Sequence, residues 1–229
     1  MEKISADQTT SVDIFPSDKE LGYIPTGGNV LDVGCGDGKL AEWLSERSFS
    51  VSAIDINQNA INANKKRDTK VSYGLQDITI KTTFPDYFFD LLCFRFTFAN
   101  IHRDEWPSTK TEIERLVSPE GFIWLVEPLV STDYQERYDL SKKVLNDEHA
   151  IFVFKNPETA KKIATTEQLK NALNQDAIQR ISKHFTREEL DQLFSSFKKV
   201  HQKTIEVVSP SGFKINTLVA LLRKQQSND

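Results

Sequence analysis

The stretch that decides the fold reads Val30-Leu31-Asp32-Val33-Gly34-Cys35-Gly36-Asp37-Gly38. An apolar strand ends here in an acid, and glycine then occupies every second position until a helical pattern begins at Lys39. Glycine has no Cβ, so a ligand can approach the backbone closely and φ can exceed zero. A strand, a glycine turn and a helix N-terminus in succession are typical of an edge that binds a nucleotide-like cofactor.

The spacing of the glycines argues against two familiar loops. A dinucleotide fingerprint needs a glycine three residues after Gly36, where this chain has Lys39. A phosphate-binding P-loop needs serine or threonine after Gly38-Lys39, where this chain has Leu40. The stretch instead resembles motif I of class I S-adenosylmethionine-dependent methyltransferases, in which an acid precedes alternating glycines. The structural alternative is an ordinary tight turn between a strand and a helix.

Composition narrows the classes of partner. The chain has 229 residues, 38% of them hydrophobic and 27% charged, as in a soluble globular protein. Its net charge of -4, with short and scattered basic clusters, predicts no general attraction to nucleic acid or to an anionic membrane. The sequence shows no signal-peptide pattern and no apolar run of the ~20 residues that span a bilayer.

Neither the two cysteines nor the histidines and carboxylates show a pattern that predicts a metal site. Cys35 and Cys93 form no C-x-x-C pair, which argues against a zinc site and fits a reducing, cytoplasmic location. No histidine or carboxylate cluster has the spacing of metal ligands. We therefore expect no metal.

Strand and helix patterns alternate from residue 29 onward, which predicts a parallel sheet with helices on both faces. Strands are expected at 30–33, 50–55, 70–74, 88–94 and 122–127, and helices at 38–47, after the capping residue Asn57, and at 108–117. Ser118-Pro119-Glu120-Gly121 is interpreted as a turn before the fifth strand.

The alternation stops after residue 128. Residues 129–184 are polar, and we expect them to be helical, without a strong strand candidate. Thr186-Arg187-Glu188-Glu189 then forms a capping box that predicts another helix. Two strands at 199–208 and 213–222, separated by a short turn, should pair antiparallel.

This order of elements resembles the class I methyltransferase domain over residues 28–128 and 185–222. The resemblance implies an α/β, Rossmann-like fold: a seven-stranded, mostly parallel sheet whose last strand is antiparallel, with helices on both faces. The expected parts are an N-terminal flap or helical lead-in (1–28), the cofactor-binding domain (29–128 and 185–222), a helical insertion that covers the acceptor site as a lid (129–184), and a C-terminal tail (223–229).

The same resemblance implies S-adenosyl-L-methionine as the cofactor. Gly34, Cys35 and Gly36 would pass close to its methionine and ribose parts, and Asp32 lies near where the family places an acid for the methionine ammonium. Asp55 is also favoured by chemistry, because two adjacent ribose hydroxyls need a bidentate acceptor and this acid ends a strand about 20 residues past the loop. Read alone, Asp55 is equally compatible with a helix cap.

Two further segments match the family. Asp77 resembles its acidic adenine contact, with Ile56 and Ile78 as neighbours of the ring, although an isolated acid here would more often be a turn residue. Phe94 and Arg95, after the fourth strand, match the segment whose backbone carbonyl meets the methionine amine.

The reaction itself forces few residues. A sulfonium already activates its methyl group, so the protein must mainly align an acceptor, and a base is needed only when the acceptor loses a proton. His102 and Glu127 are weak candidates for contact with the acceptor; the alternatives are a hydrogen-bonded loop histidine and a strand-end cap.

Taken together, the sequence predicts methyl transfer to a small-molecule acceptor on O, N or C. The acidic composition and the insertion favour it, as does the absence of an Asn/Asp-Pro-Pro-aromatic motif after the fourth strand, where the chain reads Arg95-Phe96-Thr97-Phe98. The alternatives are a protein methyltransferase, a non-catalytic module that binds cofactor or partner, and a nicotinamide oxidoreductase. No motif indicates the acceptor or the oligomeric state.

Overall fold

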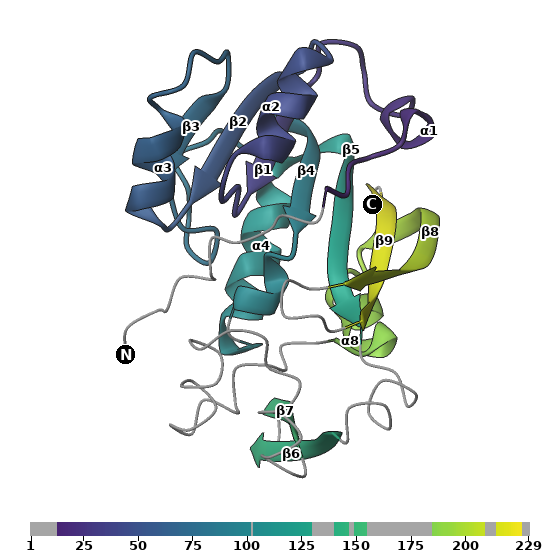
Figure 1. Cartoon of the computed structure of the whole chain (residues 1–229). Helices are drawn as coiled ribbons and strands as arrows, with labels where there is room; N and C mark the ends of the chain where they lie inside the picture. The colour runs from purple at the N-terminus through teal and green to yellow at the C-terminus, as the bar shows by residue number, and fades with distance from the viewer. Residues whose placement is uncertain are drawn as a thin grey trace.

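The computed structural model describes residues 13–101, 103–129, 140–146, 149–154, 185–208 and 214–225. Its main feature is a seven-stranded sheet with the strand order β3-β2-β1-β4-β5-β9-β8 (Figure 1). The strands are β1 (Asn29–Val33), β2 (Ser50–Asp55), β3 (Ser72–Leu75), β4 (Phe89–Arg95), β5 (Val117–Leu129), β8 (Phe197–Val208) and β9 (Lys214–Lys224).

Strands β1 to β5 pair in parallel, whereas β9 pairs antiparallel with both β5 and β8. The expected fold class is therefore confirmed, including the antiparallel last strand. Because the parallel strands end at one edge of the sheet, the glycine loop after β1 and the residues after β2, β3, β4 and β5 all lie at that edge.

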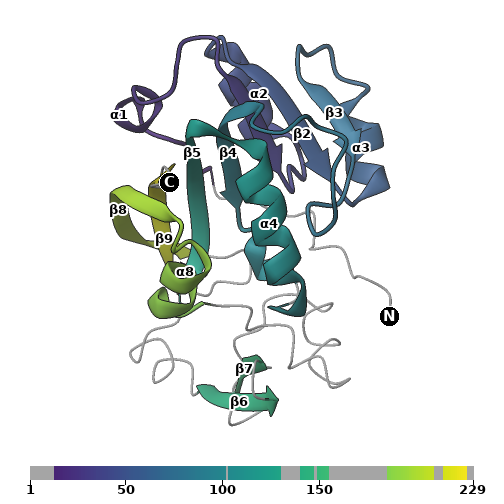
Figure 2. The same cartoon turned by 180° about the vertical axis from the view of Figure 1, so that it is seen from behind.

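Helices cover both faces of this sheet. Helix α2 (Lys39–Glu46) lies on one face and α4 (Trp106–Leu116) on the other, as opposite views show (Figures 1 and 2). Helix α3 (Gln58–Asn64) packs on the α2 face through Ile61, and α8 (Arg187–Leu193) packs on the α4 face through Leu190.

The helix starts follow the predicted capping chemistry. The Asn57 side chain accepts hydrogen bonds from the backbone N–H groups of Asn59 and Ala60. Thr186 and Glu189 form the reciprocal capping box of α8, with N···O distances of 3.1 and 2.9 Å. Each cap satisfies N–H groups that the first helical turn leaves without partners.

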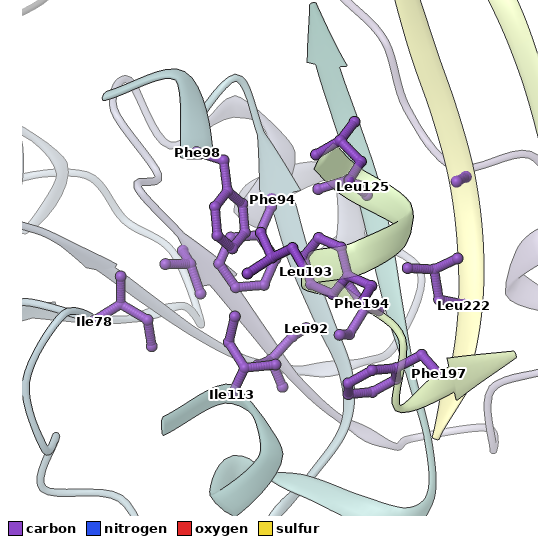
Figure 3. Close-up of a cluster of buried hydrophobic side chains, with 14 of the residues drawn as sticks. Ile78, Leu92, Phe94, Phe98, Ile113, Leu125, Leu193, Phe194, Phe197 and Leu222 are labelled. Carbon is purple, nitrogen blue, oxygen red and sulfur yellow. The ribbon is translucent and has the colours of Figure 1, made fainter. Parts of the chain in front are cut away.

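Alternation along each strand divides the core in two. On β1, Leu31 and Val33 join the cluster under α4 and α8, while Val30 joins the cluster under α2. Phe94, Phe98 and Phe194 meet in the first cluster (Figure 3). Neighbouring side chains of a strand point to opposite faces, so both surfaces of the central strands are buried.

Two expectations about strand ends need correction. Residues 118–121 are part of β5 rather than a separate turn, and the pairing partners jump from Val117 opposite Phe89 to Phe122 opposite Leu91. The four residues form an irregularity inside the strand, as a bulge does. The expected tail also begins too early, since β9 continues to Lys224.

The expectation of a helical insertion is wrong wherever the structure describes it. Strands β6 (Leu140–Asn146) and β7 (His149–Phe154) form an antiparallel pair. The pair lies beyond the edge at which β4 and β5 end (Figure 1). Residues 130–139, 147–148 and 155–184 fall outside the described part of the chain.

The insertion leaves and rejoins the fold at one place. Phe185 bridges to Leu129, and its backbone N–H donates to the carbonyl of Pro128 at 2.9 Å. Both ends of the insertion are therefore fixed at the carboxyl end of β5, next to the edge that carries the glycine loop.

Candidate cofactor-binding and active site

The glycine loop adopts a backbone that other residues rarely adopt. Gly34, Gly36 and Gly38 have φ values of +69°, +51° and +76°. The loop is anchored to β2, because the carbonyl of Ile54 accepts hydrogen bonds from the N–H groups of Gly34 and Cys35 at 2.8 and 3.0 Å. The alternating glycines are thus needed for the conformation itself.

The two sides of the loop differ in the space around them. A Cβ on Gly34 would lie 2.7 Å from Cγ2 of Thr97, whereas a Cβ on Gly36 would meet no atom within 4 Å. Thr97 also donates to the carbonyl of Val33 at 2.7 Å, which fixes the end of β1. One side of the loop is closed by protein and the other is open. Thr97 was not predicted from the sequence, because its contact with Val33 spans 64 residues.

Side chains of helix α3 and of the residues after it donate hydrogen bonds to backbone carbonyls of the glycine loop. Asn64 donates to the carbonyl of Gly36 at 2.9 Å, and Arg67 donates to the carbonyl of Asp37 at 2.7 Å. Neither residue was predicted as part of the site. Asn64 did carry a signal, since a polar residue three positions after Ile61 falls on the apolar side of a helix.

Asp55 joins the glycine loop to the start of α3. Its carboxylate accepts the N–H of Gly36 at 2.9 Å and the N–H of Asn57 at 2.8 Å. A carboxylate offers about four acceptor positions, so two remain after these bonds. The side chain is half-buried at the strand end where a ribose-binding acid was expected.

Asp32 is the most unusual acid of this edge. It is buried, and it accepts a backbone hydrogen bond from Ala41, in the first turn of α2, whose N-cap Gly38 offers no side chain. Its Oδ2 atom has no hydrogen-bond partner. Burial raises the pKa of Asp32 to about 7, although the Arg95 charge acts in the opposite direction.

Arg95, at the end of β4, supplies the complementary charge. Its side chain is 10% exposed and lies 3.8 Å from Asp37, measured from Nη2 to Oδ1. Its Nη1 atom is buried without a hydrogen-bond partner. A buried donor of one charge and a buried acceptor of the other thus remain without hydrogen-bond partners at the sheet edge that carries the glycine loop.

The residues predicted around adenine lie at neighbouring strand ends. Asp77 Oδ1 accepts from the N–H and the hydroxyl of Thr79, at 2.9 and 2.7 Å. Ile56 is 51% exposed and can offer an apolar surface, whereas Ile78 is buried in the α4 cluster. Leu75, 47% exposed and paired with Asp55 across the strands, was not predicted.

Two of the predicted residues can face a ligand only through their backbone. The Cys35 thiol is buried in the α2 cluster, and burial raises its pKa well above the ordinary value. The Phe94 ring is fully buried and packs 4.9 Å from the ring of Phe98.

Both carboxylate oxygens of Glu127 accept hydrogen bonds from the protein. Oε1 accepts from the N–H groups of Thr97 and Phe98 at 2.9 and 2.8 Å, and Oε2 accepts from Ala99 at 3.2 Å. Complete burial raises the pKa of Glu127 to about 8, against these three donors, which favour its charged form. The geometry is that of the strand-end cap, extended to the whole loop after β4.

Phe96 shows what this cap holds in place. It has a φ of +57°, which is uncommon for a residue with a side chain. Its N–H donates to Val126 at 2.8 Å, and its carbonyl accepts from Asn100 at 3.0 Å. The loop after β4 is therefore a strained turn fixed from β5.

The other weak candidate, His102, lies outside the described residues. Within the described ranges, no group of three or more His, Cys, Asp or Glu side chains could hold a metal ion. None of the described helices is long and apolar enough to cross a membrane.

Two cavities of the described part of the chain are not lined by residues of the glycine loop. One, of about 230 Å³, is lined by Leu190 and Phe194 of α8 and by Leu218 of β9. The other, of about 850 Å³, is lined by Glu46, Arg67 and neighbouring residues near the start of β2. The site is therefore assigned by backbone geometry and unused polar atoms rather than by a closed cavity.

Known proteins share this sequence pattern and this fold. The family described as "Methyltransferase domain" matches residues 15–197 of the chain. The chain belongs to this methyltransferase family. Among solved structures, a methyltransferase from Methanosarcina mazei, described as S-adenosylmethionine-dependent, has a TM-score of 0.68 at 20% identity, covering 93% of this chain and 100% of that one.

A second methyltransferase structure comes from Burkholderia thailandensis. This 1,6-didemethyltoxoflavin-N1-methyltransferase, with bound 1,6-didemethyltoxoflavin and S-adenosylhomocysteine, has a TM-score of 0.60 at 17% identity over 91% of this chain and 74% of that one. At such identities the likeness establishes the fold.

Two curated methyltransferases are similar over shorter stretches. The malonyl-[acyl-carrier protein] O-methyltransferase of Serratia marcescens is 29% identical over 129 residues, which are 56% of this chain and 49% of that one. The ribosomal RNA small subunit methyltransferase C of Chromohalobacter salexigens is 48% identical over 42 residues, 18% of this chain and 13% of that one. The chain spans less than half the length of either relative.

Proposed function

We propose that this methyltransferase binds S-adenosyl-L-methionine at the glycine loop and transfers its methyl group to a small-molecule acceptor. The observation that carries the proposal is a pair of buried polar atoms without hydrogen-bond partners, Asp32 Oδ2 and Arg95 Nη1, at the sheet edge that carries the open Gly36. Buried polar atoms are normally satisfied, so such a pair points to a ligand with both charges.

The cofactor fits these residues group by group. Its α-amino acid end carries an ammonium, which Asp32 would hold, and a carboxylate, which Arg95 would hold through a charge-assisted hydrogen bond. Asp55 has acceptor positions left for two ribose hydroxyls. Ile56 offers an exposed apolar surface for the ring, with Asp77 after the next strand. Gly34, Cys35, Gly36, Ile78 and Phe94 would complete the site; the side chains of Cys35, Ile78 and Phe94 are buried, so these three would contribute through their backbone.

When bound, the cofactor supplies a methyl group already activated by its sulfonium. The chain's own residues bind and orient it, and the loop after β4, held by Glu127, forms the adjoining wall. Correct alignment of two reactants is worth up to about 7–11 kcal/mol of a reaction barrier. The insertion, anchored at Leu129 and Phe185, would exclude water above this edge.

A small-molecule acceptor is supported by the net charge of -4 and by the Arg95-Phe96-Thr97-Phe98 sequence in place of a proline-containing amino-methylating motif. A macromolecular acceptor is the alternative, because the similar proteins include enzymes named for ribosomal RNA and for an acyl-carrier protein. Incubation with methyl-labelled cofactor and a fractionated lysate separates the two: label should enter small metabolites, and label confined to RNA or protein would contradict the proposal.

The cofactor assignment is tested at Asp55. S-Adenosylhomocysteine should stabilise the protein through preferential binding to the folded state, whereas NAD and NADP should not. Asp55→Asn should weaken the affinity for S-adenosylhomocysteine by about tenfold or more, since it removes a charged acceptor. Asp68→Asn, an exposed acid near the start of β3, is the matched control and should bind like wild type. An unchanged affinity of the Asp55 variant would remove this acid from the site.

A further inference from the structure

The N-terminal segment, residues 13–28, packs across the α2 face of the sheet. Its helix α1 (Asp18–Leu21) is closed by a capping box between Ser17 and Glu20. The buried Glu20 lies 3.4 Å from Nδ1 of His201 on β8, and Ile24 is buried in the α2 cluster. These contacts hold residues 17–24 in place, and they do not involve residues 13–15.

Residues 13–15 reach the start of α2, directly after the glycine loop. Asp13 lies 3.5 Å from Nζ of Lys39, the first residue of α2. Phe15 stacks on Trp43, with ring centroids 4.9 Å apart and an angle of 15° between the planes. Arg47 adds its guanidinium 3.6 Å from the Trp43 ring. Phe15 is therefore seated on α2 by contacts that involve neither Asp32 nor Asp55.

Phe15 also lies near the Arg95 guanidinium of the site. Cζ of Arg95 lies 5.9 Å from the Phe15 ring centroid, within the range of a cation–π contact. The charged groups around Arg95 are Asp37, at 3.8 Å, and Asp32, which it affects electrostatically. Phe15 is therefore an apolar neighbour of this guanidinium, whose side chain is only 10% exposed.

We propose that Phe15 is a positioning residue for the amino-acid end of the cofactor: seated on Trp43, it holds Arg95 in a dry position from which it grips the carboxylate. A guanidinium–carboxylate pair is stronger where water is excluded, and a side chain held by stacking loses less entropy when it binds. This inference rests on the proposed function, because it assigns a role within the same site.

The test compares two ligands that differ in the amino-acid end, whose carboxylate Arg95 would grip and whose ammonium Asp32 would hold. S-Adenosylhomocysteine carries the amino-acid end, and 5′-methylthioadenosine has the same adenosine and thioether without it. Measured by calorimetry, Phe15→Ala should lower the affinity for S-adenosylhomocysteine by about tenfold and change the affinity for methylthioadenosine less than twofold. Phe15→Tyr keeps the ring and should restore wild-type affinity. Tyr23 is an exposed aromatic residue of the same segment, and Tyr23→Ala should leave the affinity for both ligands unchanged.

A double-mutant cycle supplies the second measurement. With Arg95→Met in the background, Phe15→Ala should no longer affect S-adenosylhomocysteine, because its effect acts through Arg95. An equal loss of affinity for both ligands in Phe15→Ala would overturn the inference and leave Phe15 a structural residue. Additive losses of affinity for S-adenosylhomocysteine from Phe15→Ala and Arg95→Met would do the same. If wild-type protein binds S-adenosylhomocysteine and Phe15→Ala binds it equally well, this inference alone fails; if wild type does not bind it, the proposed function fails.

Discussion

Two buried acids lie at the same edge of the sheet and differ in what they contact. Asp32 lies near the end of β1 and keeps one oxygen without a partner, whereas Glu127 lies near the end of β5 and accepts three backbone N–H groups. Burial raises the pKa of both, to about 7 and about 8.

The comparison teaches that burial and a raised pKa do not by themselves mark a binding residue. Hydrogen bonds decide the matter: the acceptors of Glu127 serve the loop after β4, while Asp32 retains an acceptor for a ligand. We therefore assign Glu127 to the stability of the site and Asp32 to recognition, and the predictions below test this division.

The largest effect is expected at Glu127. Glu127→Ala leaves three buried N–H groups around residues 97–99 without an acceptor, which should lower the free energy of unfolding by about 3 kcal/mol or more. Asp32→Asn, the matched control, should change it by less than about 1 kcal/mol, because burial already disfavours the charged form. Urea titration measures both. A Glu127→Ala protein of wild-type stability that has lost only methyl transfer would contradict the division.

The glycine loop offers a similar contrast of a closed and an open side. Gly34→Ala adds a Cβ at positive φ, 2.7 Å from Thr97, and should destabilise the protein by about 2–4 kcal/mol. Gly36→Ala adds backbone strain alone and should lower the free energy of unfolding by about 1–2 kcal/mol. It should also lower the affinity for the cofactor. Thermal unfolding with and without S-adenosylhomocysteine compares them. Equal stability losses would show that Thr97 does not close the loop as described.

The smallest effect concerns pH. Because the pKa of Asp32 is raised to about 7 without ligand, the carboxyl is largely protonated below that pH, and an ammonium ligand requires it to lose the proton. The affinity for S-adenosylhomocysteine should therefore rise by about tenfold from pH 6 to pH 8. In Asp32→Asn this increase should disappear, while the titration of Glu127 remains common to both proteins. An equal pH dependence in the variant would show that Asp32 does not contact the ammonium.

Local patterns predicted most of the fold. The apolar runs of β1, β2 and β4 and the caps at Asn57 and Thr186 depend on neighbours within a few positions, and the structure has them. The same is true of the site where it follows the chain locally: Asp32, the glycines and Asp55 come together because adjacent parallel strands end at one edge.

Contacts between distant segments were not predictable in this way. The role of Glu127 depends on a loop 28–30 residues away, and Phe15 meets Arg95 only because the N-terminal segment crosses α2. The hairpin of β6 and β7 is a different case. The apolar run Ile151-Phe152-Val153-Phe154 was a strand signal in the sequence, and the polar character of its surroundings obscured it.

One titration tests the central claim, that the glycine loop, Asp55 and the Asp32–Arg95 pair form a site for the adenosyl cofactor. Calorimetry of the wild-type protein with S-adenosylhomocysteine should give saturable binding of one ligand per chain, weakened by Asp55→Asn and by Arg95→Met. Absence of binding to S-adenosylhomocysteine and to S-adenosylmethionine, by a protein shown to be folded, would contradict the account.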